Sequence, residues 1–337
     1  MKKAFTRSGD VHRLRLASRL LIGNKPGDPT ERDVLVYTPP GYDPARRYPL
    51  LVDLIGYTGS GASHTNWRPF GFNLPERLDR LIGSGAMAPA IVALPDAFTA
   101  YGGNQYIDST ATGPYQRYLV EEVVPFVEGA FSCGGARERR GVFGKSSGGY
   151  GALLHAMRAP DTWGAAACHS GDAYFEWCYL AAAPQFLAQI AKHGESVEAF
   201  LAAVWGKEKV TADEMHALMF VGMAAHYDPD PDAPLGFQLP VDLHTGAIRW
   251  DRWERWLRHD PVRLLDAHAA DLRRSKLLWI DCGTRDQYGL VWGARLLHQG
   301  LERLGIAHVY EEFDDDHSDI DYRMDRSLPA LVAALGG

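Results

Sequence analysis

Apolar positions along the chain recur with two different periods. Short runs of apolar and β-branched residues, the first three of which end at proline or glycine, predict β-strands. In other segments the apolar residues recur every three or four positions, as on residues 115–131, where Leu119, Val123 and Phe126 fall on one side of a predicted helix. The predicted strands are Arg32–Thr38, Tyr48–Ile55, Ala90–Leu94, Lys276–Ile280 and His308–Phe313, and a helix over residues 291–304 separates the last two.

This alternation of strands and helices predicts the fold class. Strands that are separated by helices pair in parallel, and the helices then cover both faces of the sheet. The sequence therefore predicts an α/β protein with a mostly parallel sheet and helices on both faces.

One block interrupts the alternation. Residues 174–271 contain no convincing strand but several stretches of helical period, at 184–192, 197–205 and 213–226. We expect a core in two parts, residues 1–173 and 272–337, with residues 174–271 as a helical cap insertion. In this block Trp250, Trp253 and Trp256 recur every three residues. Their large aromatic area favours packing of the cap over contact with a substrate.

Composition and charge narrow the possible partners. The chain has 337 residues, of which 46% are hydrophobic, and a formal net charge of −7. This balance does not favour nucleic acid or a membrane surface as a partner, and no apolar run is long enough to span a membrane. The N-terminus lacks the apolar core of a secretory signal, and the four cysteines lack C-x-x-C spacing. We expect a cytoplasmic protein that acts on a small molecule, and leave open whether it forms a homo-oligomer.

The stretch GVFGKSSGGYG, residues 141–151, fits two motifs that imply different proteins. Its Gly-Lys-Ser matches the end of a phosphate-binding P-loop, but that motif also needs glycine at position 139, where the chain has Arg139. The apolar run Leu277–Ile280 followed by Asp281 resembles a magnesium-binding strand and gives this alternative weak support. A P-loop nucleotide-binding protein is therefore the weaker hypothesis.

The second motif is the G-x-S-x-G of a serine hydrolase. The apolar residues Val142 and Phe143 lead directly into it, and a helical pattern follows it, as at a strand–turn–helix nucleophile elbow. Such a turn requires small residues two positions on either side of the serine, which Gly144 and Gly148 provide. The motif therefore predicts Ser146 as a nucleophile.

An acid and then a histidine should follow the nucleophile in the chain. Asp286 stands on the loop after the predicted strand 276–280, and His317 follows the last strand. Asp281 and His308 lie within or at the start of strands, where structural roles are favoured. The carboxylates around His317 lack the glycine and terminal glutamate of a calcium loop, so no metal and no cofactor is predicted.

Taken together, these motifs resemble the putative-esterase family of α/β-hydrolases, which includes esterase D, S-formylglutathione hydrolases, enterochelin esterases and mycolyltransferases. The resemblance covers nearly the whole chain and is carried by VYTPPGY at 36–42, IGYTGSG at 55–61 with Trp67, the elbow, DCGTRD at 281–286 and the loop of His317. It implies an α/β-hydrolase fold and a catalytic triad of Ser146, Asp286 and His317.

The resemblance also implies an oxyanion hole made by the backbone N–H groups of Tyr57 and Ser147. Two positions depart from the family pattern: Ile55 stands where a histidine is usual, and Lys145 stands where S-formylglutathione hydrolases carry histidine. The expected activity is hydrolysis of small or aryl carboxylic esters. An acyltransferase, a thioesterase and a non-catalytic binding module remain alternatives on this fold.

Aromatic residues near the start of the predicted cap suggest how the substrate is held. Tyr174 and Trp177, together with Trp67, are the candidate substrate-binding residues. They favour an apolar or aryl pocket, although packing of the cap explains Tyr174 and Trp177 equally well.

Overall fold

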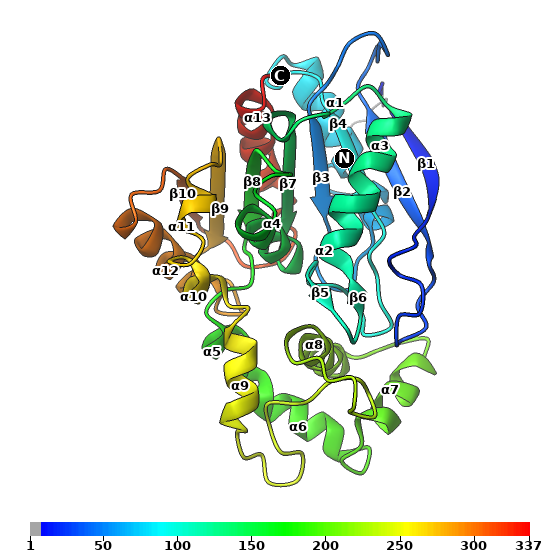
Figure 1. The fold of residues 1–337 in the computed structure, drawn as a ribbon, viewed down its shortest axis with the longest axis vertical. Coiled ribbons are helices and arrows are strands. Elements are labelled where there is room, and N and C mark those ends of the chain that lie inside the picture. The colour runs from blue at the N-terminus through cyan, green and yellow to red at the C-terminus, as the bar shows by residue number, and fades with distance from the viewer. Residues whose placement is uncertain (1–7) are drawn as a thin grey trace.

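A computed structural model of the protein describes residues 8–337 and has a single large sheet at its centre (Figure 1). The sheet has eight strands in the order β1-β2-β4-β3-β7-β8-β9-β10. From β4 to β10 all neighbours are parallel, whereas β2 is antiparallel to both β1 and β4. The strands are β1 Asp10–Ala17, β2 Glu31–Thr38, β3 Leu50–Leu54, β4 Ile91–Pro95, β7 Arg140–Lys145, β8 Ala165–His169, β9 Leu277–Gly283 and β10 Val309–Phe313; β5 Asp108–Ser109 and β6 Gly113–Pro114 form a separate pair.

The five strands predicted from the apolar runs are confirmed, and the sheet is mostly parallel as expected. Strand β1 was not predicted. It alternates Arg13 and Arg15 with Leu14 and Leu16, and its arginines pair with Asp33 and Glu31 on β2. An edge strand with one charged face has a weaker apolar signal than the buried central strands.

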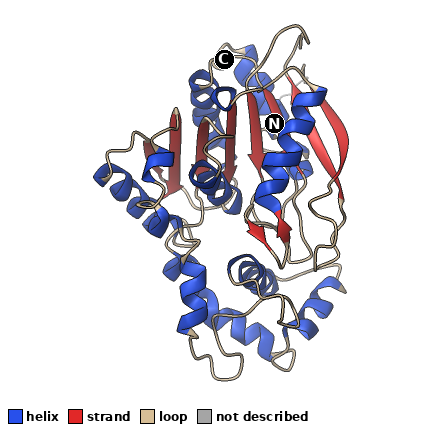
Figure 2. Cartoon of the chain, viewed as in Figure 1, coloured by secondary structure: helices blue, strands red, loops and turns tan. Residues whose placement is uncertain are grey.

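Helices cover both faces of the sheet (Figure 2). Alternate residues of each central strand face opposite layers, so that Val52 and Leu54 join one buried cluster and Leu51 joins the other. The first layer contains α4 Ser147–Arg158, α12 Leu290–Arg303 and a continuous helix formed by α2 Tyr115–Arg117, a π-helical turn at Tyr118–Val123 and α3 Val124–Ala130; the second contains α1 Leu74–Gly83 and α13 Met324–Ala334.

The segment between β8 and β9 contains only short and medium helices, and most of it forms the lower body of the molecule in Figure 1. We call residues 174–271 the helical insertion; the division of the chain into three parts at these bounds stays a prediction. Trp253 and Trp256 are buried in it, as the packing interpretation requires, but Trp250 is 61% exposed. The helices are α5 Phe175–Cys178, α6 Ala183–Ala191, α7 Val197–Trp205, α8 Ala212–Tyr227, α9 Trp250–Leu257, α10 Pro261–Leu264 and α11 Ala269–Leu272.

Hydrogen bonds anchor the helical insertion at its neck and along its flank. The buried carboxylate of Asp260, just before α10, accepts from the backbone N–H groups of Tyr174 and Phe175 at 3.1 and 2.9 Å. The chain entering the insertion is thus bound to the chain leaving it. Farther out, the Ser109 hydroxyl donates to the Ala225 carbonyl at 2.6 Å.

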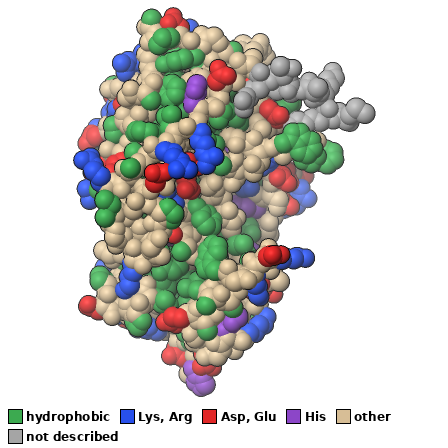
Figure 3. Space-filling model, turned by 90° about the vertical axis from the view of Figure 1, so that its right-hand side faces the viewer, with side chains coloured by type: hydrophobic (Ala, Val, Ile, Leu, Met, Phe, Trp, Pro, Cys, Tyr) green, Lys and Arg blue, Asp and Glu red, His purple; other side chains and the backbone are tan. Residues whose placement is uncertain are grey.

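The surface carries charges of both signs. Figure 3 shows Lys and Arg side chains interspersed with Asp and Glu on the face that it presents, without a continuous basic area. Within residues 8–337, no helix combines the length and the apolar character that crossing a membrane would require.

Two histidines are fully buried in the neutral form. His155 on α4 donates from Nε2 to the Tyr106 carbonyl at 3.0 Å and accepts at Nδ1 from the indole of Trp163 at 2.9 Å. Burial lowers the pKa of His155 to about 4, and it lowers the pKa of His226 on α8 to about 4 as well. Both ring nitrogens of His155 are in use, so protonation would break the bond from Trp163.

We therefore expect the free energy of unfolding to decrease as the pH falls from about 6.5 to about 4. In this window the unfolded chain, with a histidine pKa of about 6.5, binds protons that the folded chain does not. Each buried histidine should contribute a slope of up to about 1.4 kcal/mol per pH unit. Urea unfolding of wild type and His155→Leu between pH 4 and 8 measures this slope.

At pH 7 the variant should have a lower free energy of unfolding than wild type. Between about pH 4 and 6.5 this free energy should fall less steeply, because unfolding of the variant takes up about one proton fewer. His244→Gln is the matched control, because the His244 side chain is 80% exposed. Equal slopes for His155→Leu and wild type would contradict the assignment of a neutral His155.

Candidate active site

Ser146 lies at a sharp turn between the end of β7 and the start of α4. Its backbone angles are φ 58° and ψ −127°, a conformation that is costly for any residue other than glycine. The turn is held by hydrogen bonds from the Ser146 amide to the His169 carbonyl and from the Tyr150 amide to the Ser146 carbonyl, both 2.9 Å long. This is the strand–turn–helix geometry that the G-x-S-x-G motif predicts.

The glycines of the motif are required by close backbone contacts. A Cβ atom on Gly144 would lie 2.3 Å from the Leu54 carbonyl oxygen, and one on Gly148 would lie 1.7 Å from the same oxygen. Neither position can accept a larger residue unless β3 moves. The turn can therefore form only with glycine on both sides of Ser146.

The neighbouring Ser147 faces the interior. It is 1% exposed, its hydroxyl accepts from Gln105 at 2.7 Å and donates to Asp172 at 3.3 Å. Ser147 is the first residue of α4, and the N–H at that position of a helix has no acceptor within the helix. Its backbone therefore remains available for a ligand while its hydroxyl is not.

His317 and Asp286 form a hydrogen-bonded pair. The Nδ1 atom of His317 donates to Asp286 Oδ2 at 2.7 Å, and the Tyr288 amide donates to Asp286 Oδ1 at 2.9 Å. The backbone of His317 is fixed in turn by a bond to the Gln287 side chain at 2.9 Å. With Nδ1 engaged, the Nε2 atom is left to accept a proton from another group.

Asp281 has different partners. Its buried carboxylate lies 2.7 Å from His169 Nδ1, 3.0 Å from the indole N–H of Trp279 and 3.1 Å from Arg323 Nε. Burial favours the neutral acid, but His169, the hydrogen bond from Trp279 and the charge of Arg323 together lower the pKa of Asp281. This carboxylate thus joins β8, β9 and the start of α13.

His308 and Arg139 also lie away from this pair. His308 contacts the Ile306 carbonyl and the ring of His298, both at 2.8 Å. Arg139 ends a short 3-10 turn, and β7 then runs from Arg140 to Lys145, so the apolar strand occupies the positions that a P-loop would need for its phosphate-binding loop. The backbone does not have the P-loop arrangement.

Ser146 and His317 both line one cavity of about 390 Å³. Its walls come from the ends of β3, β7 and β8, from the loops that follow β9 and β10, and from α8 of the helical insertion. The lining residues are Ile55, Gly56, Tyr57, Thr58, Gly59, Ser63, His64, Arg68, Lys145, Ser146, Asp172, Cys178, Tyr179, Met215, His216, Met219, Tyr288, Leu290, His317 and Asp321.

The amide of Tyr57 lies beside Ser146. A Cβ atom on the preceding Gly56 would be 3.5 Å from the Cβ atom of Ser146, so the two loops are in van der Waals contact. Among the described residues the Tyr57 amide has no hydrogen-bond acceptor. The phenol of Tyr57 donates to the carbonyls of Tyr101 and, at 3.1 Å, Leu218, which fixes the loop against the insertion. The role of the Tyr57 and Ser147 amides as an oxyanion hole stays a prediction.

The candidate substrate-binding aromatics are more peripheral. Trp67 and Tyr174 are not among the residues that line this cavity, and Trp67 is 72% exposed. Trp177 lines a neighbouring cavity of about 510 Å³, together with Trp292. The two cavities share His216, Cys178, Met219 and Tyr288, so they are adjacent. A substrate role for all three aromatics stays a prediction.

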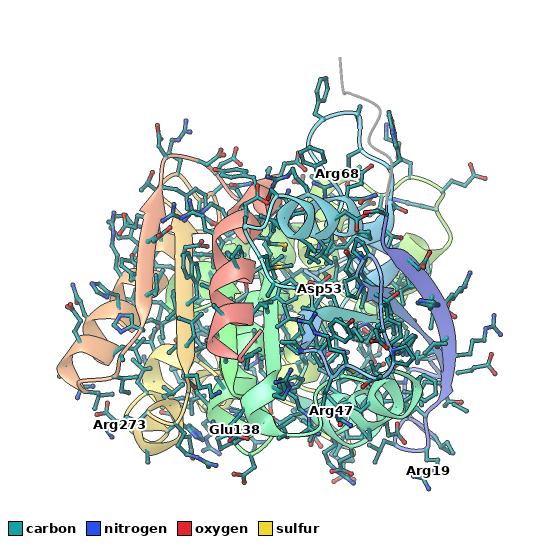
Figure 4. All side chains as sticks on the ribbon, turned by 90° about the horizontal axis from the view of Figure 1, so that it is seen from above. Arg19, Arg47, Asp53, Arg68, Glu138 and Arg273 are labelled. Carbon is teal, nitrogen blue, oxygen red and sulfur yellow. The ribbon has the colours of Figure 1, made fainter. Side chains whose placement is uncertain are left out.

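Several ionisable side chains in the cavity were missed from the sequence. His64 lies 2.5 Å from the buried Asp53, and Arg68 lies 2.9 Å from Asp321. Figure 4 shows Arg68 closer to the edge of the molecule than Asp53. Asp53 lies on strand β3, His64 and Asp321 on two short 3-10 helices, and Arg68 on a loop, and no motif links them in the sequence. Within residues 8–337, no cluster of histidine, cysteine and acidic side chains could hold a metal ion.

Asp172 was also missed, although its position carries a signal. It follows the end of β8, next to the strand that bears Ser146, and ligands of parallel α/β sheets bind at this edge. It accepts from the Tyr179 hydroxyl at 2.7 Å. Burial raises the pKa of Asp172, despite the opposing hydrogen bond from Tyr179.

Comparison with known proteins agrees with this geometry. The fold matches solved structures of α/β-hydrolase esterases, at sequence identities that support the fold alone. A ferulic acid esterase has a TM-score of 0.63 and 19% identity, covering 98% of this chain and 100% of that chain. An S-formylglutathione hydrolase from Agrobacterium tumefaciens has a TM-score of 0.59 and 18% identity, covering 99% and 98%. The fluorophosphonate-binding serine hydrolase F of Staphylococcus aureus has a TM-score of 0.59 and 16% identity, covering 96% and 98%.

The family follows from the sequence itself. Residues 28–325 match the family model described as putative esterase, which is most of the chain. The protein belongs to the putative esterase family, as the motifs had indicated.

Proposed function

We propose that the protein is a serine carboxylesterase that hydrolyses small or aryl carboxylic esters through an acyl-enzyme on Ser146. The observation that carries the proposal is the shared cavity. Ser146, on its strained turn, faces the same space as His317, whose Nδ1 is held by Asp286. The proposed nucleophile and the proposed base thus line one cavity, and the base is bonded to the proposed acid, which supports acyl transfer at this site.

The chemistry would proceed in two stages. His317 Nε2 accepts the proton of the Ser146 hydroxyl as the oxygen attacks the ester carbonyl, and Asp286 stabilises the resulting imidazolium. The amides of Tyr57 and Ser147 donate to the oxyanion, and the positive end of α4 adds to their effect. The alcohol leaves with the proton from His317, and water then hydrolyses the acyl-enzyme by the same steps.

The size and lining of the cavity support a small ester. A volume of about 390 Å³ is at the lower end of the range for small-molecule sites. Tyr288 and Tyr179 present aromatic rings, and Met215 and Met219 on α8 add flexible apolar surface. This lining suits an aryl or short alkyl group on at least one side of the ester bond.

A panel of activated esters combined with a covalent probe tests the proposal. We expect turnover of 4-nitrophenyl acetate and of aryl acetates, with a decline for long acyl chains. An organophosphonate should abolish turnover and add its mass to the peptide that contains Ser146. Labelling of Ser147, or labelling without loss of turnover, would contradict the assignment of the nucleophile. Adding a thioester and an acceptor alcohol to the panel tests the thioesterase and acyltransferase alternatives.

A further inference from the structure

Most ionic groups of the catalytic cavity have a partner of opposite charge. His317 is bonded to Asp286, His64 to Asp53, and Arg68 to Asp321. Burial alone would lower the pKa of His64, but the charge and hydrogen bond of Asp53, together with the charge of Asp321, raise that pKa, so the imidazolium is favoured. These pairs leave one cation of the cavity to be explained.

Lys145 is the exception. It is the residue immediately before Ser146, and its side chain is largely buried and lines the cavity. Among residues 8–337 its ammonium has no hydrogen-bond acceptor and no carboxylate within 4.0 Å. Burial lowers the pKa of Lys145, and the more distant charges of Asp321 and Asp319 compensate only in part. The described residues thus leave this cation of the cavity without a counter-ion in direct contact.

Charges of both signs act on Lys145: Asp321, Asp319 and Asp286 favour its ammonium form, whereas burial and Arg68 disfavour it. The amino end of α4, a helix of twelve residues, begins one residue after Ser146 and carries a partial positive charge. Arg68 lies in the same cavity and also disfavours the charged form of Lys145. Asp321, the carboxylate with the largest effect on Lys145, is already bonded to Arg68. An anion that entered the cavity would give Lys145 the direct partner that residues 8–337 do not provide.

Resting on the proposed esterase function, we propose that Lys145 forms a subsite for a carboxylate on the substrate, so that the natural substrate is a short ester with a free acid group. The side chain starts one residue from the nucleophile and reaches about 6 Å, which places the carboxylate within a few bonds of the ester carbonyl. The carboxylate can belong to the acyl part, as in a half-ester of a dicarboxylic acid, or to the alcohol part, as in an ester of a hydroxy acid.

Matched pairs of esters test the subsite. For the acyl part, 4-nitrophenyl hemiglutarate is compared with 4-nitrophenyl pentanoate; for the alcohol part, 4-acetoxybenzoate is compared with 4-acetoxybenzamide. In at least one pair the wild type should favour the anion by roughly ten- to hundredfold in kcat/KM, the range of a hydrogen bond to a charged group, after subtraction of the uncatalysed rate. The pair that shows the preference identifies the part that carries the carboxylate.

Lys145→Met keeps the aliphatic length and removes the charge, so that preference should fall to about onefold. Lys192→Met is the control: this exposed lysine of the insertion bonds to Gln189 and lies outside the cavity, and the preference should persist. Lys145→Gln serves the same purpose if the methionine variant does not fold by circular dichroism. A wild type that favours the neutral ester in both pairs, or a preference that survives loss of Lys145, would overturn the subsite.

The failure of the subsite can be separated from failure of the esterase proposal. Hydrolysis of neutral esters without anion preference refutes only the subsite. If no ester is hydrolysed, calorimetric titration of Ser146→Ala with 4-acetoxybenzoate and 4-acetoxybenzamide still decides it. Tighter binding of the carboxylate, lost in Ser146→Ala/Lys145→Met, supports the subsite, and equal affinities refute it.

Discussion

Replacing Ser146 by alanine is expected to lower the turnover of an activated ester by roughly a millionfold, to the small rate that an oxyanion hole and substrate binding can sustain alone. The hydroxyl is the proposed nucleophile, and no neighbouring group replaces it, because the Ser147 hydroxyl is buried and bonded to Gln105 and Asp172. Turnover of 4-nitrophenyl acetate and circular dichroism of the two proteins measure the effect.

Ser147→Ala provides the matched control. It removes the neighbouring hydroxyl but keeps the backbone N–H, so we expect a far smaller loss of turnover. Some stability should be lost, because Gln105 loses its acceptor and Asp172 loses one of its two donors. If Ser146→Ala retained wild-type turnover, the esterase proposal would be wrong.

Asp286→Asn is expected to lower turnover by up to roughly four orders of magnitude with little change in stability. An amide in this position keeps the shape of the site but can bond to the wrong tautomer of His317, as it does in serine proteases. Asp281→Asn should have the opposite profile: roughly 3 kcal/mol less stable, because a buried charge network loses its anion, with catalysis affected much less in the folded fraction.

The two variants are compared by urea unfolding and by kcat on one activated ester. Both carboxylates are buried and both bond to a histidine. The two substitutions are therefore chemically matched, and a difference in kcat between the variants reports on catalysis and not on burial. A crippled but stable Asp281→Asn, together with an active Asp286→Asn, would assign the orienting role to Asp281 and contradict the proposed triad.

The fold could be predicted because its signals are local. The apolar runs that became β2, β3, β4, β9 and β10 are visible in the sequence, and the first three end at proline or glycine. Gly144 and Gly148 are required because a Cβ atom on either would collide with β3. For the same reason, the candidates Ser146, Asp286 and His317 could be chosen from their order and from the strands that precede them.

The rest of the cavity could not be predicted, because its residues meet only after folding. Asp53 appears in the sequence as a polar interruption of an apolar strand, and its partner His64 lies on a short 3-10 helix without a motif. Arg68 and Asp321 are more than 250 positions apart. Lys145 was visible as a departure from the family pattern, but only the structure shows that its charge has no partner. The edge strand β1 was missed for a different reason. The arginines on its exposed face leave few apolar residues, so the alternation of apolar and polar positions is weak.

The attachment of the helical insertion has a consequence for how substrates are selected. Its neck is fixed by Asp260, and its flank is bonded to the core through Ser109 and through the phenol of Tyr57. Because the helical insertion is bonded to the core at both places, it does not need to close over a ligand in the cavity. Binding therefore requires little reorganisation of the protein. We expect the opening to act as a fixed sieve, in which the width of an ester decides whether it enters and the departure of product is not delayed by a moving gate.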